Sequence, residues 1–185
     1  NVLCGGAGSD TVSGQNGDDS LAGGAGADSL VGGAGNDNLY GGGLAQFGYG
    51  AFVPDTAADT LVGGAGDDRY WIDSPADVVS EFAGGGTHDV VNSSIDNSLA
   101  FYANVEALVL RSGTDAWYAG GSIGNDVLVG NSADNYLVGG AGNDTLAGSV
   151  DAIGVSGLAS DVLDGGDGND VLIAFFYGSS FLQET

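Results

Sequence analysis

Large apolar residues recur along much of the chain at intervals of nine, and each lies in a short triplet with β-strand propensity, such as SLV or TLA. They are Val12, Leu21, Leu30, Leu39, Leu61, Tyr70, Leu128, Leu137, Leu146, Leu163 and Leu172. The pattern predicts a succession of short strands, each of which points one large side chain into a common core.

Turns rich in glycine and aspartate separate these strands, and turn and strand together follow the frame GGxGxDxUx, where U is the large apolar residue. Six copies keep the first six positions: GGAGSD at 5, GGAGAD at 23, GGAGND at 32, GGAGDD at 63, GGAGND at 139 and GGDGND at 165. GQNGDD at 14 and GSIGND at 121 lack one glycine each, and GNSADN at 130 keeps only the phase. Because glycine permits positive φ and close backbone approach, each nonamer is predicted to be a turn followed by a strand.

Two nonamers are predicted to make one full coil of an all-β, right-handed parallel β-roll, or β-solenoid. Turns of the same parity then stack about 4.8 Å apart, the spacing of neighbouring strands. The turn that ends at Asp10 should stack on the one that ends at Asp28, and Asp19 should stack on Asp37 in the same way. Three later turns should form one column, those that end at Asp126, Asp144 and Asp170.

The repeats divide the chain into two blocks with a degenerate segment between them. The first block is residues 1–71, the segment is 72–120, and the second block is 121–173. We expect the segment to continue the coil with fewer ions, the alternative being a separate small β-element. Extra residues predict loops at about 43–57 and 149–159, and 174–185 is expected to be a C-terminal cap or the start of a further region.

The amino-acid composition limits the partners and bonds that the chain can form. The 185 residues include 37 Gly and 25 acidic residues but only two basic ones, Arg69 and Arg111, which gives a net charge of -23. This charge disfavours nucleic acid and anionic membranes as partners. No apolar run is long enough for a membrane span. Cys4 is the only cysteine, so no disulfide forms within the chain.

Of the acidic residues, 22 are Asp and only three are Glu. A merely solvated acidic surface has no reason to exclude Glu. Aspartate closes turns through its own backbone and holds a hard oxygen ligand close to the main chain. The preference points to turns that hold a cation.

In these nonamers the chain resembles the RTX family, the calcium-binding β-rolls of secreted bacterial proteins. The resemblance implies that several Ca²⁺ ions lie between turns of successive coils, held by the sixth-position aspartates and by glycine carbonyls. By position, the carboxylate ligands would be Asp10, Asp19, Asp28, Asp37, Asp59, Asp68, Asp126, Asp144, Asp161 and Asp170. The carbonyl ligands would come from Gly6, Gly8, Gly24, Gly26, Gly33, Gly35, Gly64, Gly66, Gly140, Gly142, Gly166 and Gly168. Weaker candidates are Asp18, Asn36, Asp67, Asp89, Asn135, Asn143, Asp167 and Asn169.

Asn135 stands where the repeat has aspartate, and a neutral amide attracts Ca²⁺ less, so we expect an empty or poorly occupied site there. Asp89 belongs to GGGTHDVVN at 84, in which Thr87 replaces the fourth glycine.

The resemblance also implies a function. Burial of one leucine stabilises the fold by about 1.5–3 kcal/mol, which is less than the conformational entropy that ordering nine residues costs. Ca²⁺ binding is therefore expected to drive folding. The chain would then be a module of a larger, type I secreted bacterial protein, extracellular or at the cell surface, that folds after export. The rest of that polypeptide would be its partner. The alternative is a calcium-stiffened structural or adhesive surface segment. The open strand edge of the first coil suggests end-to-end self-association.

Catalytic motifs are weak. His88 is the only histidine, which excludes HExxH zinc sites, and the absence of lysine excludes a P-loop. GGSIG at 120 matches the GxSxG elbow around Ser122, but the repeat demands these glycines and the histidine precedes the serine. We expect no catalytic site.

Three aromatic residues could stack on carbohydrate: Trp71, Trp117 and Tyr118. We favour the interpretation that they are partly buried and close the roll. The seventh position lacks the threonine ladder expected of an ice-binding face.

Overall fold

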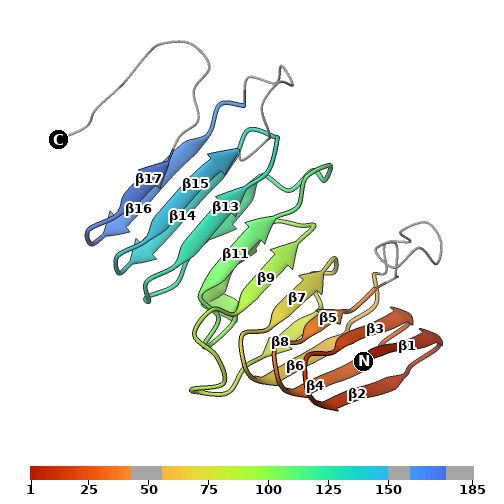
Figure 1. Ribbon diagram of the computed structural model, residues 1–185. Helices are drawn as coiled ribbons and strands as arrows, with labels where there is room; N and C mark the ends of the chain where they lie inside the picture. The colour runs from red at the N-terminus through yellow and green to blue at the C-terminus, as the bar shows by residue number, and fades with distance from the viewer. Residues whose placement is uncertain (43–55, 150–158, 174–185) are drawn as a thin grey trace.

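The computed structural model describes residues 1–42, 56–149 and 159–173 (Figure 1). In these residues the chain coils so that successive strands fall alternately on opposite faces, and every strand pair is parallel. The prediction of an all-β parallel roll is confirmed. None of the described residues forms a helix long and apolar enough to cross a membrane.

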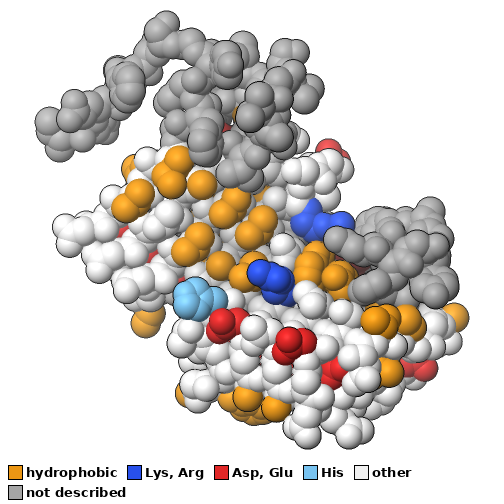
Figure 2. All heavy atoms as spheres, in the orientation of Figure 1, with side chains coloured by type: hydrophobic (Ala, Val, Ile, Leu, Met, Phe, Trp, Pro, Cys, Tyr) orange, Lys and Arg blue, Asp and Glu red, His pale blue; other side chains and the backbone are white. Residues whose placement is uncertain are grey.

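One face is a nine-stranded sheet of the odd-numbered strands, which runs the length of the described molecule. Its members are β1 Val2–Ala7, β3 Ser20–Ala25, β5 Asn38–Tyr40, β7 Arg69–Ile72, β9 Val90–Ser93, β11 Ala107–Leu110, β13 Val127–Gly130, β15 Thr145–Ser149 and β17 Val171–Ile173. Figure 2 shows apolar side chains on the outside of its later strands, where Val127 and Val171 are exposed.

The opposite face consists of two four-stranded sheets. The first contains β2 Thr11–Asn16, β4 Ser29–Ala34, β6 Thr60–Ala65 and β8 Val78–Ser80. The second contains β10 Asn97–Ser98, β12 Tyr118–Gly120, β14 Tyr136–Ala141 and β16 Val162–Asp167. A short 3₁₀ turn, Leu99–Phe101, directly follows β10.

The register of the strands follows the repeat. Val2 pairs with Ser20 and Leu21 with Leu39, which is one coil per 18 residues. Leu30 pairs with Leu61 in the same register even though extra residues separate β4 from β6. The extra residues therefore do not change which side chains of β4 and β6 face the core.

Eighth-position side chains from the strands of both faces fill the interior. Those fully enclosed are Leu21, Leu30, Leu39, Leu61, Tyr70, Leu128, Leu137 and Leu146. Val12 and Leu163, in coils near the ends of the described roll, are only partly buried, and Leu172 in β17 is 49% exposed. The exposure of the terminal positions follows from having a neighbouring coil on one side only.

The segment 72–120 continues the nine-stranded sheet without a break, but on the opposite face its strands β8 and β10 do not pair with each other. β9 pairs with β7 and β11, and β11 pairs with β13, so this sheet crosses the segment without interruption. On the other side the sheets end at β8 and begin again at β10. Leu99 and Val105 are buried in the core there and take over the role of repeat leucines.

The loops predicted at 43–57 and 149–159 lie largely outside the described residues, and 174–185 lies wholly outside them. Trp71 and Tyr118 are partly buried, and the Trp71 ring stacks on Tyr40 with centroids 4.2 Å apart. Trp117 is 53% exposed, so the expectation of a partly buried ring is wrong there. The reason is its place at the sixth position, on the edge of the roll, rather than at the inward-pointing eighth.

Candidate metal sites

The sixth-position aspartates form a ladder along one edge of the nine-stranded sheet. The Oδ1 atom of each aspartate accepts a hydrogen bond from the backbone N–H of the aspartate one coil earlier. Asp19 N donates to Asp37 at 2.8 Å, Asp37 N to Asp68 at 2.7 Å, and Asp68 N to Asp89 at 2.7 Å. The predicted stacking of Asp19 on Asp37 is confirmed.

The same ladder continues into the second block. Asp89 N donates to Glu106 Oε2 at 2.9 Å, Asp126 N to Asp144 at 2.8 Å, and Asp144 N to Asp170 at 2.9 Å. The predicted column of the turns ending at Asp126, Asp144 and Asp170 is therefore confirmed. Asp126 differs from the others because its own carboxylate accepts hydrogen bonds from the backbone N–H and hydroxyl of Ser122, which replaces a turn glycine.

A second ladder follows the opposite edge of the roll. Asp10 N donates to Asp28 Oδ1 at 2.8 Å, as predicted, Asp28 N to Asp59 at 2.8 Å, and Asp59 N to Asp77 at 3.1 Å. Beyond the break between β8 and β10 this edge holds different residues. There Asn135 N donates to Asp161 Oδ1 at 2.9 Å.

The second carboxylate oxygen of these aspartates faces the space between coils. Oδ2 is buried and accepts no hydrogen bond from the described residues in Asp10, Asp19, Asp37, Asp68, Asp89 and Asp144. A buried ionised oxygen without a partner is costly unless a cation compensates it. The row of Oδ2 atoms is therefore the strongest indication of metal binding in the molecule.

Backbone carbonyls meet the Oδ2 atoms because the turns contain glycine. A Cβ built on Gly5 would lie 2.7 Å from both Asp10 Oδ2 and the Gly23 carbonyl oxygen of the next coil. A Cβ on Gly24, whose φ is +116°, would collide with the carbonyl of Gly6. The glycines thus leave oxygen-lined gaps between coils, and hard oxygens from carboxylates and carbonyls are the donor set that Ca²⁺ prefers.

All twelve glycines predicted to supply carbonyls have positive φ. The fold places them in stacked turns, at the second and fourth positions on both edges of the roll. Close approach of consecutive coils at these positions explains why the repeat restricts them to glycine.

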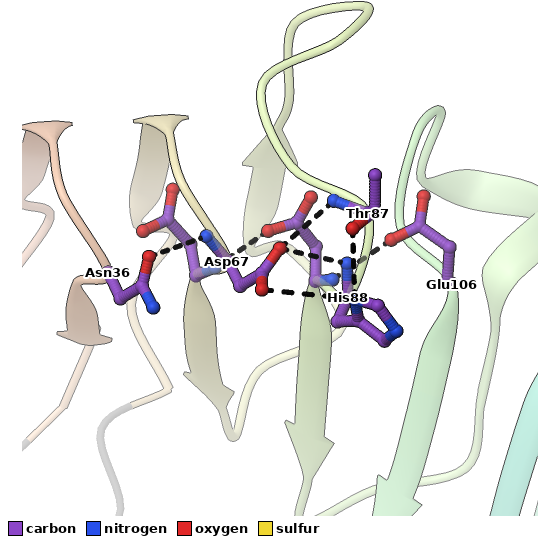
Figure 3. A network of polar contacts seen from close by, with 7 residues as sticks. Asn36, Asp67, Thr87, His88 and Glu106 are labelled. Atoms are coloured by element: carbon purple, nitrogen blue, oxygen red, sulfur yellow. Dashed lines mark hydrogen bonds and ion pairs between the residues drawn. The ribbon is translucent and has the colours of Figure 1, made fainter.

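Fifth-position side chains form an exposed ladder that runs in the opposite direction (Figure 3). Asn36 N donates to Asp18 Oδ1, Asp67 N to Asn36 Oδ1, and the backbone N–H groups of Thr87 and His88 to Asp67 Oδ1. The hydrogen bond from Thr87, followed by that from His88, lowers the pKa of Asp67. These side chains, predicted as weaker ligands, tie neighbouring turns together on the outside of the roll.

The weaker candidates of the second block are placed similarly. Asn143 N donates to Asn125 Oδ1, and Asn169 N donates to Asn143 Oδ1. Asp167 is exposed at the end of β16.

Asn135, at a sixth position, is buried. Its amide nitrogen donates to Ala116 O and Asn131 Oδ1, and its Oδ1 accepts from Asn131 N. That amide is held by protein groups, and the expectation of a poorly occupied site there stays a prediction.

Burial changes the acidity of the ladder. It raises the pKa of Asp68 to about 7, and the nearby Glu81 carboxylate adds to the rise. Burial raises the pKa of Asp89 to about 6, again with a contribution from Glu81. The pKa values of Asp37 and Asp126 are raised by burial as well. Without a bound cation, the ionised aspartates of the ladder therefore destabilise the coiled chain.

Sequence reasoning missed three acidic residues of the ladders and their surroundings: Asp77, Glu81 and Glu106. Asp77 and Glu106 take sixth positions and precede inward-pointing Val79 and Leu108. The triplets DVV and EAL therefore keep the acidic and apolar spacing of the repeat without its glycines, and a search for that spacing alone would have found them. No such spacing of acidic and apolar residues marks Glu81.

Comparison with known families agrees with this geometry. The chain matches the family described as RTX calcium-binding nonapeptide repeat (4 copies) over residues 1–30, 13–43, 55–71, 120–152 and 155–174, more than half of its length. No curated protein matches the chain.

Proposed function

Because the chain belongs to the RTX calcium-binding nonapeptide repeat family, we propose that its calcium-binding β-roll is a folding switch, disordered without Ca²⁺ and coiled with it, in a larger exported bacterial protein. The observation that carries the proposal is the row of buried, unpartnered Oδ2 atoms between coils. The coiled state brings these carboxylates together at one coil spacing, where they repel one another. Bound Ca²⁺ supplies positive charge and about six to eight oxygen bonds per ion.

The residues of the chain make its folding depend steeply on the calcium concentration. With a net charge of -23, self-repulsion opposes compaction along both edges of the roll. Each site takes its oxygens from two coils, so the site does not exist in the unfolded chain and binding energy becomes folding energy. Occupation of one gap also positions the turn of the next, which favours cooperative folding.

Export is the setting in which such a switch is useful. We propose that the chain passes a type I secretion channel unfolded, in calcium-poor cytosol, and coils in calcium-rich surroundings outside the cell. Support comes from a fold that needs no disulfide, with Cys4 exposed and free. We propose no catalytic role for the module. The Ser122 hydroxyl donates to Asp126 Oδ1 and accepts from Gly124 N, which is a structural turn.

Circular dichroism of the purified chain tests the switch. In EGTA we expect the far-ultraviolet spectrum of a coil, and on addition of millimolar Ca²⁺ a β-sheet spectrum with a sigmoidal titration. Mg²⁺ should not substitute, because it demands a small octahedral site and retains its water. A chain that is equally β-structured and protease-resistant in EGTA would contradict the proposal.

A further inference from the structure

Three buried carboxylates meet where the first block joins the degenerate segment. Asp68 precedes β7 and Asp89 precedes β9, both in the nine-stranded sheet, while Glu81 directly follows β8 in the opposite sheet. One carboxylate oxygen from each residue lies within 4.8 Å of the other two. Asp68 and Asp89 are 0% exposed and Glu81 is 8% exposed.

The oxygens of this cluster point into a common space. Asp68 Oδ2 and Asp89 Oδ2 are both buried and accept no hydrogen bond from the described residues. A Cβ built on Gly63 would collide with Asp68 Oδ2, Glu81 Oε1 and the Tyr70 hydroxyl oxygen, so these three atoms surround the space that the missing side chain leaves. Oxygens of Asp68 and Glu81 therefore converge beside Gly63, and an oxygen of Asp89 lies within 4.8 Å of an oxygen from each of them.

Glu81 is held in place by protein groups. Its Oε1 accepts hydrogen bonds from Gly64 N at 3.2 Å and from the Tyr70 hydroxyl, and its Oε2 accepts from Phe82 N at 3.2 Å. Tyr70 is fully buried at the inward-pointing eighth position. A glutamate fixed by its own turn and by a core tyrosine is preorganised, and a carboxylate oxygen can accept a cation in addition to such hydrogen bonds.

No basic side chain neutralises the cluster. In the described part of the chain, neither of the ion pairs involves Asp68, Glu81 or Asp89. Buried negative charge at this separation is costly unless a cation compensates it.

We propose that Asp68, Glu81 and Asp89 together hold one Ca²⁺ ion, in a three-carboxylate site that the nonapeptide pattern does not encode, and that this is the tightest site of the chain. The inference rests on the proposed function, because it requires that the coils take up Ca²⁺ at all. A repeat site takes one aspartate from each of two coils, and the added glutamate raises the ligand charge, which increases affinity for Ca²⁺. Because Glu81 comes from the other face, the ion also ties β8, the last strand of its sheet, to β7 and β9.

A crystal structure of the full chain grown with Tb³⁺ in place of Ca²⁺ tests the site directly, since anomalous scattering locates each ion. We expect a peak among Asp68, Glu81 and Asp89, with a carboxylate oxygen of all three within bonding distance. Peaks in the repeat turns but none here, or a peak that Glu81 does not contact, would overturn the inference and leave the proposed function standing. A folded chain without any peak would contradict both.

Isothermal titration with Ca²⁺ gives a second readout through Glu81→Gln. We expect this variant to lose the tightest class of sites, with an affinity there on the order of tenfold lower or worse. Asp164→Asn is the matched control, since it removes one negative charge from an exposed side chain of β16. Equal stoichiometry and affinity in the two variants would overturn the inference. If Glu81→Gln does not fold, the Tb³⁺ positions in the unsubstituted chain decide.

Discussion

The two carboxylate oxygens of a ladder aspartate such as Asp144 have different surroundings. In Asp144, Oδ1 accepts the N–H of Asp126 at 2.8 Å, while Oδ2 is buried without a hydrogen-bond donor among the described residues. One oxygen therefore belongs to the backbone ladder, and the other is the oxygen that we propose binds the cation. Asparagine can reproduce the first contact but not the negative charge of the second, which allows the two roles to be separated by substitution.

We expect Asp144→Asn to raise the calcium concentration at the midpoint of folding, because a ligand charge is lost. Asp144→Ala should do the same and also lower the free energy of unfolding in saturating Ca²⁺ by about 1–3 kcal/mol relative to the asparagine variant, since Asp126 N then lacks its acceptor. Calcium titration and urea denaturation, both followed by circular dichroism, measure the two effects. Equal unfolding free energies for the two variants would show that the Oδ1 contact contributes nothing.

Stacking of turns ahead of β5, β7 and β9 places ionisable groups from three strands in one column. Burial raises the pKa of Asp68 to about 7 and that of Asp89 to about 6, against an ordinary value of 3.8. Because these folded-state pKa values lie above the unfolded one, protonation favours the coiled chain. Their contribution to stability is complete below about pH 4 and is lost as the pH rises through about 6 and 7.

Without Ca²⁺, the chain is therefore expected to gain β-structure as the pH falls from 8 to about 4.5. Acid here replaces the metal by removing the negative charge that opposes stacking. Circular dichroism in EGTA across this range is the measurement. With Ca²⁺ present the midpoint calcium concentration should instead rise at low pH, since protons compete for the same oxygens. More β-structure at pH 8 than at pH 4.5 in EGTA would contradict the assignment.

Strands were predictable from sequence wherever the turn and the apolar position kept their spacing. The stacking of turns of the same parity agrees with the pairing of Leu30 with Leu61, because the turn after the insertion restores the phase. The runs ADVVSE and NVEALVLR are strand-like, but the frame did not assign Asp77 and Glu106 to the ladders, since these turns lack the glycines. Glu81 could not be foreseen at all, because its neighbours Asp68 and Asp89 are set by the coiling of two other strands.

At the scale of the molecule, one sheet joins the two blocks within residues 1–42, 56–149 and 159–173. The nine-stranded sheet passes through β9 and β11, whereas the opposite sheets stop at β8 and restart at β10. Leu108 in β11 is fully buried and pairs in register with Val91 and Leu128. We therefore expect cooperative folding of both blocks to depend on packing at this junction more than on packing within either block.

Leu108→Ala is expected to uncouple the two blocks. Removing a buried leucine costs about 2–5 kcal/mol, and here the loss falls where no second sheet spans the gap. In saturating Ca²⁺ we expect urea denaturation to change from a single transition to two. Leu137→Ala in β14 is the matched control, since Leu137 is equally buried but both faces continue on either side of it. It should lower stability while keeping one transition. A single transition in Leu108→Ala, shifted no more than in Leu137→Ala, would show that the nine-stranded sheet alone is enough to fold the roll as one unit.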